Sequence, residues 1–213
     1  MTLRDDYGHW ANSFYAPMAR AWGDFLDAVR YGLFGDDRWE DLRFPFTGNR
    51  IDISSGRIDY DYEECTVDFA TNARYDDEPV CFIIQMPHAW SEGTAVRPHL
   101  HWLQEEDDDP NWLLRYRTIA NGGAPGSWTN TDPSTLRTYT YSSGTLLQIT
   151  KFPEISMTGL KISDFIDCIL FRDQSNSSGE FSSSDTYSVA AKAKEFDIHY
   201  QVDSDGSSQE YVK

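Results

Sequence analysis

The sequence has few cysteines, few basic residues and no long hydrophobic run, and each shortage excludes a class of protein. The three cysteines, Cys65, Cys81 and Cys168, lack CxxC spacing and lie in or beside apolar segments, which indicates free thiols. Eighteen Lys and Arg stand against 35 Asp and Glu, a formal net charge of −17, so no basic stripe is available for nucleic acid or an anionic membrane. No apolar run reaches the roughly 18 residues of a transmembrane helix, and the first ten residues lack a signal-peptide pattern. We therefore expect synthesis in a cytoplasm and no nucleic-acid or membrane partner.

Aromatic residues are abundant, with 7 Trp, 12 Tyr and 12 Phe against 4 Met, which favours β-sheets. Short segments bounded by Gly, Asp, Asn, Ser or Pro follow one another from residue 58 onward. They predict nine strands: Ile58–Tyr62, Thr66–Ala70, Pro79–Met86, Val96–Gln104, Trp112–Ile119, Arg137–Ser142, Leu146–Phe152, Asp167–Asp173 and Glu195–Asp203. Trp39–Phe46 is interpreted as an extended linker. The predicted fold class is mainly β, an antiparallel β-sandwich with an N-terminal α-helix, and the strand number fits a jelly roll better than an immunoglobulin-like domain.

The N-terminal region predicts an amphipathic helix ahead of this body. Apolar side chains recur at steps of three and four residues. They are Trp10, Phe14, Met18, Trp22, Phe25, Leu26, Val29 and Leu33. The predicted domains are a helical arm over residues 1–38 and a β-sandwich over 39–213. The helix either folds onto its own domain or docks on another subunit, and the pattern leaves both alternatives open.

Two histidines on one predicted strand raise the question of a metal site. His99 and His101 point to the same side of the strand, about 7 Å apart along it. The spacing Gly93, five residues, His99-x-His101, three residues, Glu105 resembles the first motif of the cupins, a double-sheet fold that binds metals. The second cupin motif is missing, because His199 is the only later histidine and its neighbours do not match.

We therefore predict neither a metal nor a cofactor. His99 and His101 are expected to hydrogen-bond to neighbouring strands or to another subunit, with His88, which follows Pro87 at a strand end, in the same polar cluster. No GxSxG, P-loop or GxGxxG motif occurs, and the many acidic pairs are those expected by chance in so acidic a chain. The sequence predicts no enzymatic activity and no catalytic residue.

Four segments together resemble a group of structural proteins of tailed bacteriophages. They are WEDLRFPF (Trp39–Phe46), QMPHAWSEGTAVRPHLHW (Gln85–Trp102), CILFRD (Cys168–Asp173) and FDIHYQVDSDGSSQEYVK (Phe196–Lys213). The group shares W-E-D-L-R, Q-[ML]-P-H-x-[WY]-x-E-G-[ST], P-H-x-H-W and D-F-H-Y-Q-x-D, whereas this chain reads DIHYQ in the last. The predicted helix lies outside the resemblance.

The resemblance implies a virion component with a β-sandwich body, attached to the capsid, neck or tail in a decoration, collar or fibre-attachment role. Such a protein would be a homo-oligomer, most simply a trimer, because closed symmetric assemblies satisfy the contacts of every copy. The predicted helix would anchor it to other virion proteins. Further interface candidates are Trp90, Trp112, Trp128 and Tyr116. Two alternatives remain: a virion module that binds host glycans through exposed aromatic rings, and a cupin-like metal-dependent enzyme.

Overall fold

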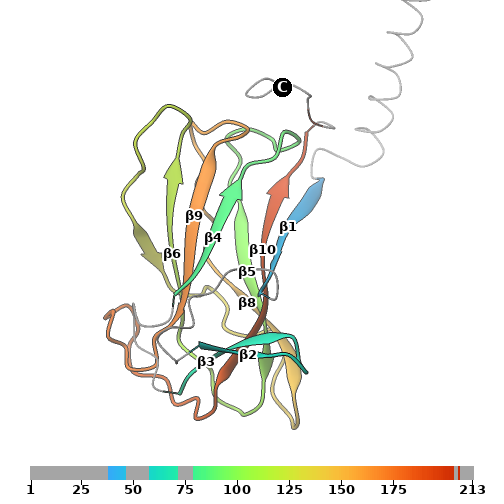
Figure 1. The fold of residues 1–213 in the computed structure, drawn as a ribbon, viewed down its shortest axis with the longest axis vertical. Coiled ribbons are helices and arrows are strands. Elements are labelled where there is room, and N and C mark those ends of the chain that lie inside the picture. The colour runs from blue at the N-terminus through green and yellow to red at the C-terminus, as the bar shows by residue number, and fades with distance from the viewer. Residues whose placement is uncertain (1–37, 47–57, 72–78, 204–205, 207–213) are drawn as a thin grey trace, which may run out of the picture. The chain divides into compact units, whose positions relative to one another are not determined.

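Ten strands pair into two antiparallel sheets in the part of the chain that the structure describes (Figure 1). This computed structural model describes residues 38–46, 58–71, 79–203 and 206. The strands are β1 (Trp39–Pro45), β2 (Ile58–Asp61), β3 (Thr66–Phe69), β4 (Val80–Gln85), β5 (Arg97–Gln104), β6 (Trp112–Ile119), β7 (Thr129–Thr131), β8 (Leu146–Lys151), β9 (Phe165–Arg172) and β10 (Ala191–Gln201). Residues 1–37 of the predicted helical arm, including its eight apolar residues, lie outside the described residues.

The two sheets pack face to face as a β-sandwich, which confirms the predicted mainly-β, antiparallel class. One sheet has the order β2-β3-β10-β5-β8, with β1 also paired to β10, and the other has the order β4-β9-β6-β7. Aromatic rings join the sheets across the core. The rings of Phe82 on β4 and Phe196 on β10 stack with centroids 4.8 Å apart, and Trp102 on β5 meets Trp112 on β6 at 6.2 Å. Burial of such large side chains is the main stabilising contribution to a sandwich.

Strand β1 shows that the linker interpretation of Trp39–Phe46 was wrong. Residues Trp39–Pro45 pair antiparallel with Gln201 to Glu195 of β10. Strand β3 pairs with Ala191–Ala193 at the beginning of β10, so β3 and β1 share the long strand β10 one after the other. Leu42 and Phe44 pack against the core, whereas Asp41 and Arg43 are exposed. The alternation in this segment is therefore that of an edge strand whose partner lies far away in the sequence.

The predicted strand Arg137–Ser142 was also wrong, although this segment does lie beside β8. The side chain of Gln148 accepts hydrogen bonds from the backbone N–H groups of Thr138 and Tyr139, at 3.2 and 3.0 Å. The Thr138 hydroxyl donates to the carbonyl of Ile149 at 3.1 Å. Hydrogen bonds that involve side chains thus replace the backbone-to-backbone hydrogen bonds of a regular strand pair, so this polar segment lies beside β8 without forming a strand.

Two of the tryptophans considered as interface candidates belong to the core. Trp90 and Trp112 are fully buried. The indole N–H of Trp90 donates to the Thr94 hydroxyl at 3.0 Å, and its backbone bridges Val202 just beyond β10. Trp128 is partly exposed, and the guanidinium of Arg117 lies 4.4 Å from the centroid of its ring. Within the described residues, no helix is long and apolar enough to cross a membrane.

Candidate functional site

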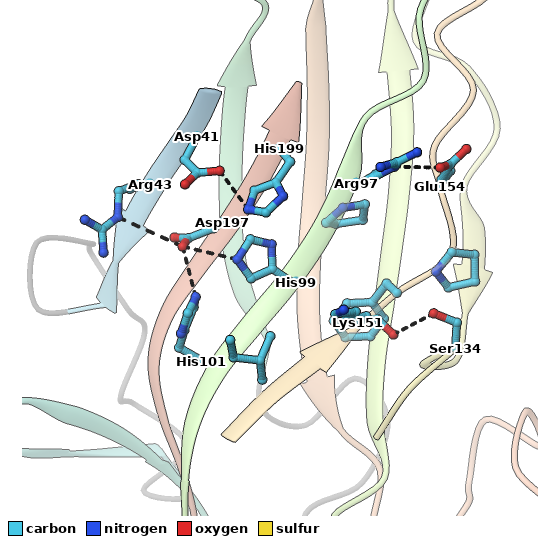
Figure 2. Close-up of a pocket in the computed structure, with 14 residues that line it drawn as sticks. Asp41, Arg43, Arg97, His99, His101, Ser134, Lys151, Glu154, Asp197 and His199 are labelled. Atoms are coloured by element: carbon cyan, nitrogen blue, oxygen red, sulfur yellow. Dashed lines mark hydrogen bonds and ion pairs between the residues drawn. The ribbon is translucent and has the colours of Figure 1, made fainter. Parts of the chain in front are cut away.

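Neighbouring strands place histidines and carboxylates side by side on the outer face of the six-stranded sheet (Figure 2). In β5, Leu100 and Trp102 face the core, so His99 and His101 point outward, as the period of two requires. In β10, Asp197 is the direct cross-strand partner of His99. The strand register therefore brings a carboxylate from residue 197 to the two imidazoles of β5.

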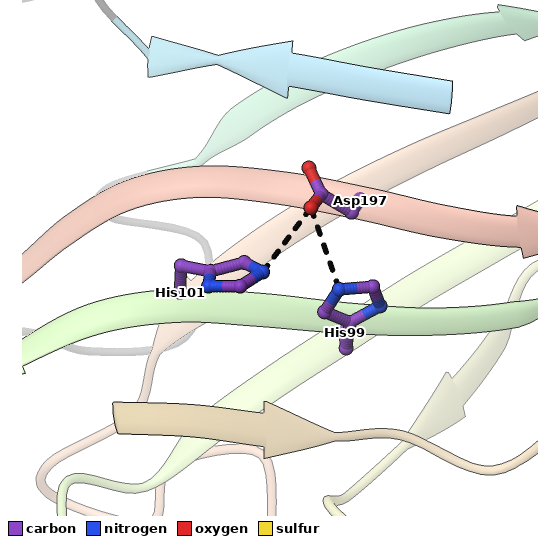
Figure 3. A group of neighbouring side chains, drawn as sticks. All are labelled: His99, His101 and Asp197. Carbon is purple, nitrogen blue, oxygen red and sulfur yellow. Dashed lines mark ion pairs between the residues drawn. The ribbon is translucent and has the colours of Figure 1, made fainter. Parts of the chain in front are cut away.

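A single carboxylate oxygen of Asp197 contacts both imidazoles (Figure 3). Its Oδ2 atom lies 3.1 Å from Nε2 of His101 and 3.4 Å from Nε2 of His99. One nitrogen or oxygen atom from each of these three residues lies within 4.8 Å of the other two. The two imidazole rings themselves are 5.0 Å apart between centroids. These three side chains form the cluster that we call the His-Asp-His cluster.

A second imidazole–carboxylate pair lies next to this cluster. His199 of β10 contacts Asp41 of β1, with 2.8 Å between Nε2 and Oδ1, and its ring centroid is 4.4 Å from that of His99 (Figure 2). Both partners are more exposed than the cluster, with 43% and 45% of their side chains accessible. Burial lowers the pKa of His199, and the neighbouring His99 lowers it further, while Asp41 acts in the opposite direction. His199 is therefore held toward its neutral form.

Asp197 is ionised despite its burial. Only 3% of its side chain is exposed. Burial alone would raise the pKa of Asp197, but hydrogen bonds from His101 and His99 and the charges of those rings outweigh it and lower the pKa well below its usual range. The other carboxylate oxygen, Oδ1, is buried and has no hydrogen-bond partner in the described part of the chain. A carboxylate can accept several hydrogen bonds, so Asp197 is incompletely satisfied.

The His-Asp-His cluster lies in a groove with a volume of about 870 Å³. Strands β1, β10 and β5 form one side of it, and Ser134 with Lys151–Glu154 form the other. The Ser134 hydroxyl donates to the Lys151 carbonyl at 3.1 Å, which holds the loop against the end of β8. Arg97 forms an ion pair with Glu154 at 2.7 Å across one end (Figure 2). His101 has 22% of its side chain accessible, so solvent and small ions reach the cluster.

The structure places the other predicted site residues elsewhere. His88 lies in the segment after β4, where its Nε2 atom is 3.0 Å from the Ser163 hydroxyl. Glu105, the acidic residue of the cupin-like spacing, forms an ion pair with Lys192 at 3.0 Å. The carboxylate that meets the histidines is instead Asp197, which stands between the buried Phe196 and Ile198 and so lies on the outward face of its own strand. That alternation in the sequence could have identified Asp197 as an outward-facing carboxylate. It could not show that β10 lies next to β5.

Comparisons with known proteins identify no family for this chain. No family model matches the sequence, and no curated protein matches it. Among solved structures, the enzymatically active domain of tailspike protein 4 from bacteriophage CBA120 aligns with 9% sequence identity and a TM-score of 0.31. The alignment covers 77% of this chain and 19% of that chain. A similarity this low does not establish a common fold.

Proposed function

We propose that this chain is a structural component of a tailed-phage virion, a homo-oligomeric jelly-roll protein attached to the capsid, neck or tail and without enzymatic activity. The observation that carries the proposal is where the segments of the phage resemblance lie. Trp39–Pro45 is β1, which pairs with β10, and β10 pairs with β5, which contains the P-H-x-H-W segment. Three segments that are far apart in the sequence are therefore adjacent strands of one sheet.

The residues in these segments support a shared scaffold. Trp90 and Trp102 are fully buried, as are Phe196 and Ile198. The segment CILFRD covers the end of β9 and includes Arg172, a buried arginine that donates to the carbonyls of Ala70 and Val189. The resembling segments thus contain buried core residues and strands that pair with one another, which are the features that define a fold. The resemblance therefore concerns the β-sandwich body, and the virion role is inferred from it.

The strand pairing supports a jelly roll for this body. Strands β3 to β10 pair as a nested set: β3 with β10, β4 with β9, β5 with β8, and β6 with β7. A long antiparallel hairpin rolled into two sheets has this nested pairing, and the jelly roll is such a fold. Viral capsid proteins and lectins both use it. Strands β1 and β2 are additions to the eight.

Oligomeric state and attachment test the proposal. We expect light scattering on the full chain to give three times the mass of one chain, and mass spectrometry to detect the chain in purified particles of the source virus. Removal of residues 1–38 should leave the β-sandwich folded and abolish attachment to particles. A finer variant, Trp22→Asp with Phe25→Asp, should act in the same way, while Asp24→Ala on the opposite side of the predicted helix should not. A monomer that is absent from particles would contradict the proposal.

A glycan-binding virion module is the second candidate, and exposed tyrosines favour it. Tyr62 is 85% exposed and Tyr139 is 65% exposed. The Tyr60 and Tyr62 rings stack with centroids 5.9 Å apart, which holds one flat ring face in place. Sugar rings stack on such surfaces, and lectins are among the jelly rolls. A glycan array with the full chain should give hits that Tyr62→Ala or Tyr139→Ala removes, and an array without hits would exclude this role.

A further inference from the structure

The His-Asp-His cluster combines the donor types that bind transition metals. Imidazole nitrogen and carboxylate oxygen are ligands for divalent zinc, iron, cobalt and nickel, and two histidines with one carboxylate is a recurrent set. His99 and His101 come from one strand, and Asp197 comes from the strand beside it. A β-ladder holds such side chains in nearly fixed positions, which lowers the cost of arranging them around an ion.

The two distances to Asp197 in the cluster are also those expected between the ligands of one metal ion. With bonds of about 2.1 Å, neighbouring ligand atoms around a metal lie about 3.0 Å apart in octahedral geometry and about 3.4 Å apart in tetrahedral geometry. The two distances to Asp197 Oδ2 are 3.1 and 3.4 Å. A charge-assisted hydrogen bond between imidazolium and carboxylate is usually shorter, at about 2.7–2.9 Å.

The protein groups around Asp197 satisfy only one of its two carboxylate oxygens. Its Oδ1 atom has no hydrogen-bond partner among the described residues. The nearest arginine nitrogen, Nε of Arg43, is 4.0 Å from Oδ2, and the same atom is only 2.6 Å from Glu195. A buried carboxylate in this state is costly unless a cation stands close to it. A divalent ion at the two imidazoles would supply that charge.

We propose that His99, His101 and Asp197 bind one divalent transition-metal cation at the outer face of the sandwich. The ion joins β5 to β10, and the open groove leaves space for water to complete its coordination. The site differs from the cupin-like spacing in the sequence, because its carboxylate is Asp197 and because its histidines face away from the core. It does not depend on the proposed virion role, and either proposal can fail alone.

Zinc binding by the full chain, produced without a polyhistidine tag and stripped with a chelator, tests this proposal. Titration calorimetry with Zn²⁺ should give one site per chain, and equal concentrations of Mg²⁺ or Ca²⁺ should not compete, because imidazole ligands favour the transition metals. Co²⁺ in place of Zn²⁺ should produce visible absorption bands that Zn²⁺ then removes. No binding above the background, or binding that Ca²⁺ displaces, would overturn the proposal.

Substitutions then identify the ligands. Removal of an outer-shell partner of a metal costs about 10–100-fold in affinity, so loss of a direct ligand in His99→Ala, His101→Ala or Asp197→Asn should cost at least about tenfold. Two controls keep zinc affinity unchanged: His88→Ala removes an imidazole outside the cluster, and Glu105→Gln removes the carboxylate of the cupin-like spacing. Affinity that survives all three cluster substitutions, or that depends on Glu105 and not on Asp197, would refute the assignment.

Thermal unfolding provides a readout of the same site in variants that remain folded by circular dichroism. A ligand that binds the folded state stabilises it by mass action. Zn²⁺ should therefore raise the Tm of the stripped wild-type chain more than that of Asp197→Asn at the same zinc concentration. Asn preserves the size of the Asp side chain, so this variant is the one best suited to keep the fold. An equal rise in both proteins would contradict binding at Asp197.

Discussion

The buried ion pair between Arg172 and Asp185 allows a quantitative test of the fold. Both side chains have 0% accessibility, and Nη2 of Arg172 lies 3.1 Å from Oδ1 of Asp185. The Nη1 atom of Arg172 also donates to the carbonyls of Phe69, Ala70 and Val189, at 3.2, 3.0 and 2.9 Å. One guanidinium thus ties the end of β9 to the end of β3 and to the segment before β10. Asp185 is its only carboxylate partner among the ion pairs found in the described residues.

The substitution Asp185→Asn keeps the shape of this side chain and removes its charge, which leaves Arg172 buried without a counter-ion. Breaking a buried pair in this way costs about 3–5 kcal/mol of the free energy of unfolding. The matched control is Glu154→Gln, which breaks the Arg97–Glu154 pair. That pair has a distance of 2.7 Å, but both its side chains are 53% exposed, so the loss should be about 0–1 kcal/mol.

Equilibrium urea unfolding followed by tryptophan fluorescence measures both losses. The slope in urea is about 1–3 kcal/mol per molar, so Asp185→Asn should lower the midpoint by at least about 1 M. If both variants have the same slope, the midpoint shift of Asp185→Asn should be at least about three times that of Glu154→Gln. Equal, small shifts for the two variants would refute the reasoning, because they would mean that the Arg172 pair is as well solvated as a surface pair.

Two further predictions concern the core. The Thr150 hydroxyl accepts a hydrogen bond from the Trp102 indole N–H at 2.9 Å and donates one to the Leu136 carbonyl. Thr150→Val removes both bonds and should lower the free energy of unfolding by about 1–3 kcal/mol in the same urea titration. An unchanged midpoint would contradict this prediction. Cys168 is buried, and burial raises the pKa of its thiol, whereas Cys65 is exposed. We therefore expect a thiol reagent to label Cys65 in the folded protein and Cys168 only after unfolding. Rapid labelling of Cys168 in the folded protein would contradict this prediction.

Most of the strand content could be predicted from the sequence, because apolar alternation is a local property. Eight of the nine predicted strands are present, and only Arg137–Ser142 is absent. The same alternation predicted that His99 and His101 share one face of their strand, and the structure places both on that face. Strand β1 was missed because Trp39–Pro45 gains its hydrogen bonds from β10, about 155 residues later, and a short polar-apolar segment does not show whether a partner edge exists.

The sequence predicted the two histidines of the candidate site but not its carboxylate, because strand pairing is not a local property. The histidine pair lies on one strand, so its spacing alone placed both rings on one face. Glu105 was the only carboxylate that the spacing could offer, and the structure pairs it with Lys192 instead. Asp197 reaches the histidines because β10 and β5 are neighbours in a nested pairing of strands, with Asp197 opposite His99. Neither adjacency nor register can be obtained from the local pattern of either strand.

By itself, the sequence determined which side of each long strand faces the core, since a one-residue shift would bury charged side chains and expose apolar ones. It also determined the acidic character of the surface and the presence of two imidazoles on one strand face. Only the tertiary structure decided which carboxylate meets those imidazoles, at which distances and with how much burial. The physical reason is that strand pairing brings together residues separated by about a hundred positions, and the electrostatics of a site depend on those neighbours.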